Sequence, residues 1–237
     1  MNGESARRGG ALVVVASALW TLPVWLTTFP PMVDYPQHLA MAAALRFWDD
    51  PARGFAESYR IAWGAPQALF EWLTAGVAWL LPIAAAGKLA VALAIAAVGP
   101  AALALTRRLG RPDWLALLPL AATTNYAYSW GFVGTLFAYP LFLAGLAVAD
   151  RLLDRLAGGG RRFGAGAWLA LAGCTLAFYL VHLQLLLVFA AAVAWLVAAR
   201  RPGWRRAAAP LSALLPGVLV VLAVVLLPNL LSPETSF

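Results

Sequence analysis

The chain has 237 residues, of which 63% are hydrophobic and 11% are charged, and its formal net charge is +7. Soluble domains carry about 25% charged residues, and a folded chain of this length has too much surface to hide so many apolar side chains from water. The composition therefore excludes an ordinary soluble domain. It predicts an all-α, polytopic bundle of transmembrane helices whose first partner is the lipid bilayer.

Most of the basic residues lie in short clusters between apolar runs, which is the positive-inside pattern of cytoplasmic loops. The clusters are Arg7-Arg8, Arg107-Arg108 with Arg111, residues 151–162 and residues 200–206. No basic stripe is interleaved with aromatic residues, so no nucleic-acid partner is expected. The pattern predicts a multi-pass protein of the cell (inner) membrane with its N-terminus in the cytoplasm.

The first predicted span covers residues 11–29. Its apolar run is long for a signal peptide, and no small-residue cleavage site follows it, so we expect an uncleaved signal anchor. Residues 30–64 then form the longest polar interval of the chain, which must lie outside the hydrocarbon. We expect an extracytoplasmic loop there, within a single transmembrane domain, 1–237.

The middle of the chain is ambiguous, because residues 66–105 fit either two spans or one span preceded by a shallow or re-entrant helix over residues 67–82. Downstream the hydropathy pattern is clearer. It predicts a hairpin of residues 114–123 and 132–148, a second hairpin of residues 165–180 and 183–199, and a last span over residues 210–227.

Charge favours one count of membrane crossings over the other. If the four basic clusters are all cytoplasmic, an odd number of crossings must join the outer loop to Arg107, and residues 66–105 are too few for three. This predicts seven crossings, with residues 67–82 dipping into the outer leaflet. Eight crossings would invert the N-terminus or place the Arg107 cluster outside.

The strongest local motif is Asp34-Tyr35-Pro36-Gln37-His38-Leu39-Ala40, just after the first span. Pro36 suits the first turn of a helix, which would place Asp34 at or near its N-cap and His38 one turn further on the same face. A carboxylate and an imidazole at this spacing are able to share a proton or a metal. The alternative is that Asp34 only caps an interfacial helix and His38 faces water.

This layout of a first span followed by an acidic residue and a short surface helix resembles the GT-C-type integral-membrane glycosyltransferases of bacteria. The resemblance implies a membrane-embedded enzyme that transfers a sugar from a polyprenyl-phosphate carrier on the extracytoplasmic face. It also implies that Asp34 is the catalytic base or helps to hold a divalent metal ion. The second outer loop, residues 123–131, lacks the acidic residue that many members have there. The short chain favours a fragment or a bare transmembrane module.

Other residues are candidates for the same site. His38, Arg53 and Arg60 are able to meet a lipid phosphate, whereas Tyr126, Tyr128 and Trp130 would stack on a sugar or simply belong to an interfacial aromatic belt. Glu71 is a second carboxylate for a metal or an interfacial side chain. His182 is a functional group at the outer face or part of a hairpin turn.

Two other classes of function compete with the enzyme. A transporter or permease component would place polar groups near the bilayer centre, yet the predicted helix centres are nearly all Ala, Leu and Val. A non-catalytic membrane assembly subunit would need a partner subunit and no site at all.

Overall fold

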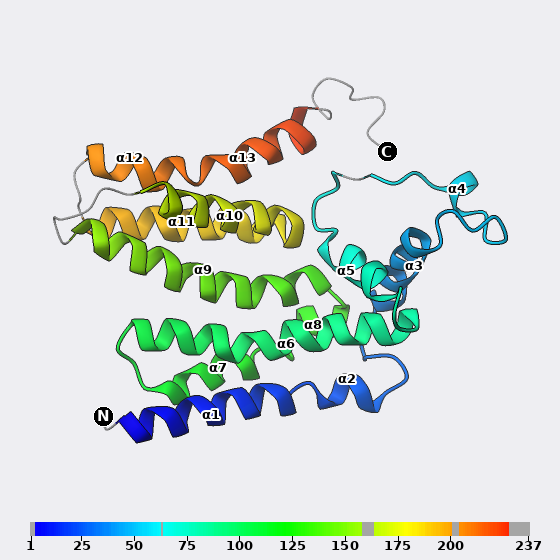
Figure 1. Cartoon of the computed structure of the whole chain (residues 1–237), viewed down its shortest axis with the longest axis horizontal. Helices are drawn as coiled ribbons and strands as arrows, with labels where there is room; N and C mark the ends of the chain where they lie inside the picture. The colour runs from blue at the N-terminus through cyan, green and yellow to red at the C-terminus, as the bar shows by residue number, and fades with distance from the viewer. Residues whose placement is uncertain (1–2, 63, 158–163, 201–203, 228–237) are drawn as a thin grey trace. The chain divides into compact units, whose positions relative to one another are not determined.

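The computed structural model describes residues 3–62, 64–157, 164–200 and 204–227, which form helices and no strand (Figure 1). The elements in chain order are α1 (Gly3–Leu19), α2 (Leu22–Leu26), α3 (Tyr35–Arg46), α4 (Phe55–Ser58), α5 (Leu69–Val77), α6 (Ile83–Arg108), the 3₁₀ helix η1 (Asp113–Ala116), α7 (Leu117–Ala121), α8 (Tyr126–Trp130), α9 (Val133–Ala157), α10 (Ala165–Val181), α11 (Leu183–Arg200), α12 (Trp204–Ser212), α13 (Leu215–Val221) and the π-helix η2 (Leu222–Leu226).

Five stretches of the described helices are long and apolar enough to cross a membrane, and they confirm a helical membrane protein. They are Arg8–Leu26, Ile83–Arg108, Val133–Asp154, Leu183–Arg200 and Ala207–Leu226. All except Ile83–Arg108 bury a third or less of their apolar window inside the protein, whereas Ile83–Arg108 buries 56%. Lipid is therefore the solvent that suits the remaining apolar faces.

The chain folds as two compact units, each of which is described by itself. Unit 1 comprises residues 1–63 and 68–140, and unit 2 comprises residues 64–67 and 141–237. The division falls within α9, next to Pro140, a residue that cannot donate a helical hydrogen bond. The predicted single domain stays a prediction.

The centre of unit 1 is α6, and α1 with α2 runs antiparallel along it (Figure 1). Three contacts show the antiparallel direction: Gly10 lies against Arg107, Gly99 lies against the Ser17 hydroxyl, and the Lys88 ammonium donates to the Thr27 carbonyl. Residues later in the first segment thus contact residues earlier in α6. The Ser17 hydroxyl donates a hydrogen bond to the Val13 carbonyl at 2.7 Å, so this hydroxyl is satisfied at the close approach of the two helices. Small residues at such positions let membrane helices pack backbone to backbone.

Antiparallel packing gives unit 1 two chemically different ends. One end, which we call the arginine end, contains the start of α1, the end of α6 and Asp113. There Arg107 Nη2 donates to Asp113 Oδ2 at 2.8 Å, and this hydrogen bond lowers the pKa of the Asp113 carboxyl. At the other end, which we call the loop end, α3, α5 and α8 gather near the start of α6. Residues 30–62 belong to the loop end.

The predicted span over residues 114–123 is helical but too short to cross a membrane. There η1 runs directly into α7, and their four and five residues rise by roughly 15 Å, half of a hydrocarbon core. The stretch from Asp113 to Trp130 nevertheless leads from the arginine end to the loop end, because Asp113 bonds Arg107 and Trp130 bonds Asp34. It does so as η1 running directly into α7 and then, after a break at residues 122–125, as α8.

Other short helices refine the expected topology. With nine residues, α5 rises by about 14 Å, about half of a hydrocarbon core, so it is too short to cross a membrane as one continuous helix. Between α1 and α2 the helix breaks at Trp20 and Thr21, where Pro23 takes one of the first two helical positions of α2. The predicted helix after Asp34 is present as α3.

Unit 2 contains the predicted hairpin of α10 and α11, which turns at His182. Its core includes the rings of Phe142, Phe178 and Phe189, and the last two have centroids 4.9 Å apart. The segment 64–67 packs on the same hairpin. The Tyr179 hydroxyl donates to the Gly64 carbonyl, and Gln67 N donates to the Tyr179 carbonyl at 3.1 Å.

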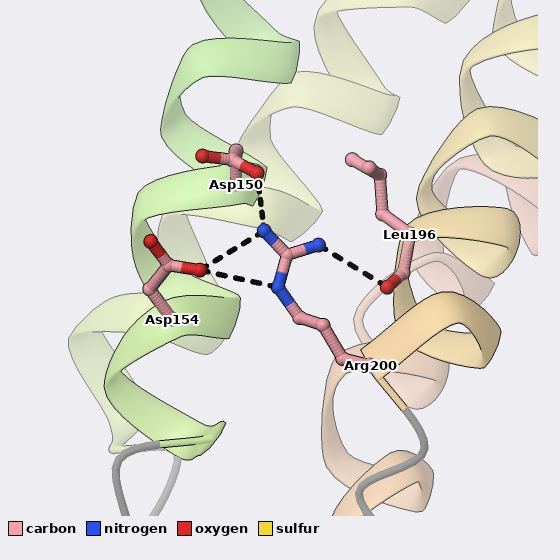
Figure 2. Close-up of polar contacts among 4 residues, drawn as sticks. All are labelled: Asp150, Asp154, Leu196 and Arg200. Atoms are coloured by element: carbon pink, nitrogen blue, oxygen red, sulfur yellow. Dashed lines mark hydrogen bonds and ion pairs between the residues drawn. The ribbon is translucent and has the colours of Figure 1, made fainter. Parts of the chain in front are cut away.

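The polar end of this hairpin is held by Arg200, which joins α11 to α9 (Figure 2). Its guanidinium donates to Asp150, to Asp154 Oδ1 at 3.0 and 3.2 Å, and to the Leu196 carbonyl at 3.2 Å. The Arg200 side chain is 19% exposed and that of Asp150 is 12% exposed. Solvent therefore screens the cluster less than it screens an ordinary surface pair.

We predict that Arg200→Gln lowers the free energy of unfolding by about 2 kcal/mol, because Gln cannot replace the charge-assisted hydrogen bonds to the two carboxylates. Arg151→Gln is the matched control, since Arg151 is exposed on α9 and the change removes the same charge. Thermal unfolding in detergent micelles measures both variants. Equal losses in the two variants would contradict a stabilising role for the cluster.

Candidate functional site

Asp34 occupies the predicted position at the start of α3. It is the N-cap residue, and Pro36 lies in the first turn, where its missing N–H leaves no bond unmade. The Asp34 side chain makes no capping hydrogen bond and is partly exposed. Asp34 therefore does not serve as an ordinary cap, and its carboxylate is accessible at the loop end.

The end of α8 fixes the backbone around Asp34. Val33 N donates to the Ser129 carbonyl and Asp34 N to the Trp130 carbonyl, each at 3.0 Å. This approach needs Gly131, which has a φ of +85° and no side chain, because a Cβ there would lie 2.8 Å from Asp34 N. Two segments almost a hundred residues apart in the sequence are thus joined by main-chain hydrogen bonds.

His38, one turn after Asp34, is bonded to Glu71 of α5, with Nδ1 and Oε1 2.6 Å apart. The side chain of His38 is 22% exposed, whereas that of Glu71 is 8% exposed. The Phe70 ring makes edge-to-face contacts with the rings of Tyr35 and His38, whose centroids lie 6.1 and 5.8 Å from its own. His38 therefore does not simply face water, and Glu71 is a buried partner, not an interfacial side chain.

Two of the three predicted aromatic residues lie on the surface beside this site. Tyr126 and Trp130 are exposed, and their ring centroids are 5.7 Å apart on α8. Tyr128, between them in the sequence, is 6% exposed. Of the three predicted aromatic residues, Tyr126 and Trp130 are the ones accessible to a ligand.

The two predicted phosphate-binding arginines lie further along the outer loop. Arg53 bonds Asp50 Oδ2 at 3.1 Å and stacks over the Phe47 ring at 3.9 Å. Arg60 is exposed beyond α4. Neither is brought against Asp34 or His38 in the described structure, so both arginines remain candidates by location alone.

His182 belongs to unit 2. Its backbone N–H donates to the Phe178 carbonyl at 2.7 Å, and its side-chain Nδ1 is buried without a hydrogen-bond partner. Burial lowers the pKa of this imidazole and favours its neutral form. His182 thus ends α10 as expected of a turn residue, and its relation to Asp34 stays a prediction.

A divalent metal ion does not fit the carboxylates as they lie. Within the described residues, no group of three or more His, Cys, Asp and Glu side chains is placed to hold a metal ion. Glu71 uses one carboxylate oxygen for His38. The predicted metal set of Asp34 and Glu71 therefore has too few ligands.

Sequence reasoning missed two features of the loop end. Arg46 Nε donates to the Ala78 carbonyl at 3.2 Å, and its guanidinium lies 3.5 Å from the centroid of Trp79, which pins the end of α3 to the end of α5. Asn125 Nδ2 donates to the Tyr139 hydroxyl at 2.7 Å. An arginine in the last turn of an apolar helix was the only available signal for the first feature.

Comparisons of the chain with protein-family models, with curated proteins and with solved structures found no match.

We predict that Gly131→Ala lowers the free energy of unfolding by about 3 kcal/mol, since it combines left-handed backbone strain with a clash against the Asp34 main chain. Gly110→Ala is the matched control. Gly110 also has a positive φ, of +64°, but a Cβ there would meet nothing within 4 Å, so a loss of about 1 kcal/mol is expected. Thermal unfolding in micelles compares them, and similar losses would show that the Gly131 contact is not close.

Proposed function

We propose that this chain is a membrane-embedded glycosyltransferase, or the transmembrane module of one. It transfers a sugar from a polyprenyl-phosphate carrier to a hydroxyl acceptor on the extracytoplasmic face. The observation that carries the proposal is the loop end of unit 1. There Asp34, the His38–Glu71 pair and the exposed rings of Tyr126 and Trp130 come from three helices. The motif of residues 34–40, which looks like the first-loop motif of uncharacterised bacterial members of the GT-C group, supports it.

The proposal includes a topology of seven crossings. The two further crossings are α10, an apolar helix of 17 residues, and the interrupted stretch from Asp113 to Trp130, which add to the five long apolar stretches. Because α1 and α6 are antiparallel, the basic residues at the start of α1 and the end of α6 share one side. The positive-inside pattern makes that side cytoplasmic, with Asp34 on the opposite side of the inner membrane.

The chemistry needs a carboxylate near the acceptor hydroxyl and positive charge near the departing phosphate. In our proposal Asp34 accepts a hydrogen bond from the acceptor hydroxyl, and Tyr126 and Trp130 stack on the sugar. Arg53 and Arg60, on the same outer loop, meet the lipid phosphate.

An apolar cavity of about 240 Å³ in unit 1 suits the lipid part of such a donor. It is lined by side chains of α5, α6 and α9, among them Leu73, Val77, Leu89, Leu93, Phe137 and Pro140. The helix that carries Glu71, α5, thus also lines part of an apolar cavity that could hold a lipid chain. An isoprenoid chain is apolar throughout and matches this lining.

A transporter is the second candidate, and the interrupted stretch from Asp113 to Trp130 favours it. Broken helices within a membrane protein often line a path for a solute, because their free backbone groups need polar partners. A transporter would move a solute across sealed vesicles without consuming a lipid-linked sugar. An assembly subunit would do neither and would purify with a partner subunit.

We predict that Asp34→Asn lowers sugar transfer by about 10²-fold or more while the protein still inserts into the membrane, because a neutral amide is a weaker hydrogen-bond acceptor for the acceptor hydroxyl than a carboxylate is. Vesicles containing a polyprenyl-phosphate-linked hexose provide the assay. Asp49→Asn is the control, since Asp49 is exposed on the same loop and the change in charge is the same. Unchanged transfer by Asp34→Asn would remove Asp34 from the mechanism.

The topology predicts opposite labelling of the two ends of unit 1. With Cys174, the single cysteine, replaced by Ala, a cysteine is introduced as Glu57→Cys in the outer loop or as Arg111→Cys at the arginine end. Both positions are exposed. A membrane-impermeant maleimide added to right-side-out vesicles should label the first variant at once and the second only after permeabilisation. The reverse order would place Asp34 in the cytoplasm.

A further inference from the structure

Three deeply buried oxygen atoms of unit 1 have no hydrogen-bond partner: Tyr35 Oη, Glu71 Oε2 and Thr74 Oγ1. Their residues are 0%, 6% and 0% exposed. All three lie on α3 and α5, the two helices that the His38–Glu71 bond joins. Native proteins leave few buried polar atoms unpaired, because each one destabilises the fold. The concentration of these three unpaired oxygens at one helix contact indicates a functional site, because a contact made only for packing would not keep them unpaired.

The surroundings hold this contact in one arrangement. The Phe70 ring packs edge-on against Tyr35 and His38. On the other side, Gly87 of α6 leaves space for the Tyr35 hydroxyl, since a Cβ on Gly87 would lie 2.6 Å from that oxygen. The imidazole and the carboxylate are therefore oriented before any ligand arrives, which is what catalysis requires of an acid–base pair.

Glu71 determines which nitrogen of His38 carries the proton. A carboxylate only accepts hydrogen bonds, so the 2.6 Å contact is donated by Nδ1–H. In the neutral imidazole this tautomer leaves Nε2 with its lone pair free to accept. The His38 side chain is 22% exposed, which lets a ligand at the loop end reach it.

We propose that His38 is the general base that takes the proton of the acceptor hydroxyl, and that Glu71 is the residue that positions it. This inference rests on the proposed function and assigns within it the destination of the proton. Asp34, one helical turn away with its Cβ about 6 Å from that of His38, orients the hydroxyl by accepting its hydrogen bond. His38 Nε2 then accepts the proton.

The step balances in the following way. The O–H bond of the acceptor breaks, and its proton goes to Nε2, which gives an imidazolium. The acceptor oxygen forms a bond to the anomeric carbon of the sugar. The bond from that carbon to the phosphate oxygen breaks, and the lipid phosphate leaves with the electron pair. The imidazolium later returns its proton to solvent.

The unpaired oxygen of Glu71 favours this role over a purely structural one. A contact built only to join α3 to α5 would satisfy both carboxylate oxygens, since leaving one bare is unfavourable. When the proton reaches His38, the neutral–charged contact becomes an ion pair at 2.6 Å in a poorly solvated place. The interaction is then stronger in the transition state than in the resting protein, and such interactions accelerate a reaction.

Nitrogen NMR of histidine-labelled protein tests the tautomer without any sugar. The chain has two histidines, so His182→Gln leaves His38 as the single reporter. At a pH where the ring is neutral, we expect the signals of an Nδ1–H imidazole with an unprotonated Nε2. A ring protonated at Nε2 would overturn the inference, because that nitrogen could not accept the hydroxyl proton.

Transfer kinetics test the roles of the two residues. In vesicles with a polyprenyl-phosphate-linked hexose, His38→Gln should lower kcat by about 10²-fold or more. Glu71→Gln should lower kcat with little change in KM for the donor, and Glu71→Asp should restore part of the loss. A loss of structure would instead be seen in thermal unfolding, and Glu71→Asp keeps the carboxylate if Glu71→Gln does not fold.

The outcomes separate the two proposals. If the wild-type chain transfers no sugar, the proposed function falls. If the wild type is active and His38→Gln retains its kcat, only the assignment of the base is overturned. If Glu71→Gln raises KM and leaves kcat unchanged, Glu71 does not position the base.

Discussion

The close approach of α1 to α6 at Ser17 and Gly99 is the constraint on which the arrangement of unit 1 depends. It makes the two helices antiparallel neighbours, so the ends that carry basic residues coincide and the loops that carry Asp34 and α5 gather at the opposite end. In lipid no hydrophobic force distinguishes one helix partner from another, and small residues that allow backbone contact supply the specificity instead. The chemistry of the loop end follows from that packing.

At the loop end, position is set by main-chain and polar contacts between segments far apart in the sequence. Gly131 lets the end of α8 hold the Asp34 backbone, while Glu71 holds His38 through its side chain. The contact with α8 fixes the position of the Asp34 carboxylate at the loop end. The second fixes which nitrogen of an imidazole is free. Both are directional, and the burial of Glu71 gives the second more weight than an exposed pair would have.

Much of this architecture could be predicted from hydropathy and turn chemistry. The long apolar helices, the turn at His182 and the N-cap position of Asp34 all follow from local pattern, because each depends on residues within a few turns of one another. The pair His38–Glu71 could not be predicted, since its partners are 33 residues apart and neither side chain reveals its burial. The partnership of Arg200 with α9 was hidden for the same reason.

The interrupted stretch from Asp113 to Trp130 shows a different limit of sequence reasoning. A hydropathy window measures how apolar a segment is, not whether its backbone stays helical. Here Pro119 falls within the five residues of α7, and Asn125 starts a new helix by accepting from Tyr128 N at 3.3 Å. Backbone groups freed at such breaks are tolerated inside a membrane only where protein or water satisfies them. The break at residues 122–125 therefore places polar main chain one short helix, α8, before the carbonyls that hold Asp34. In our proposal, proton removal from the acceptor hydroxyl depends on an imidazole whose tautomer is fixed by a buried carboxylate, and the His38–Glu71 pair meets that requirement.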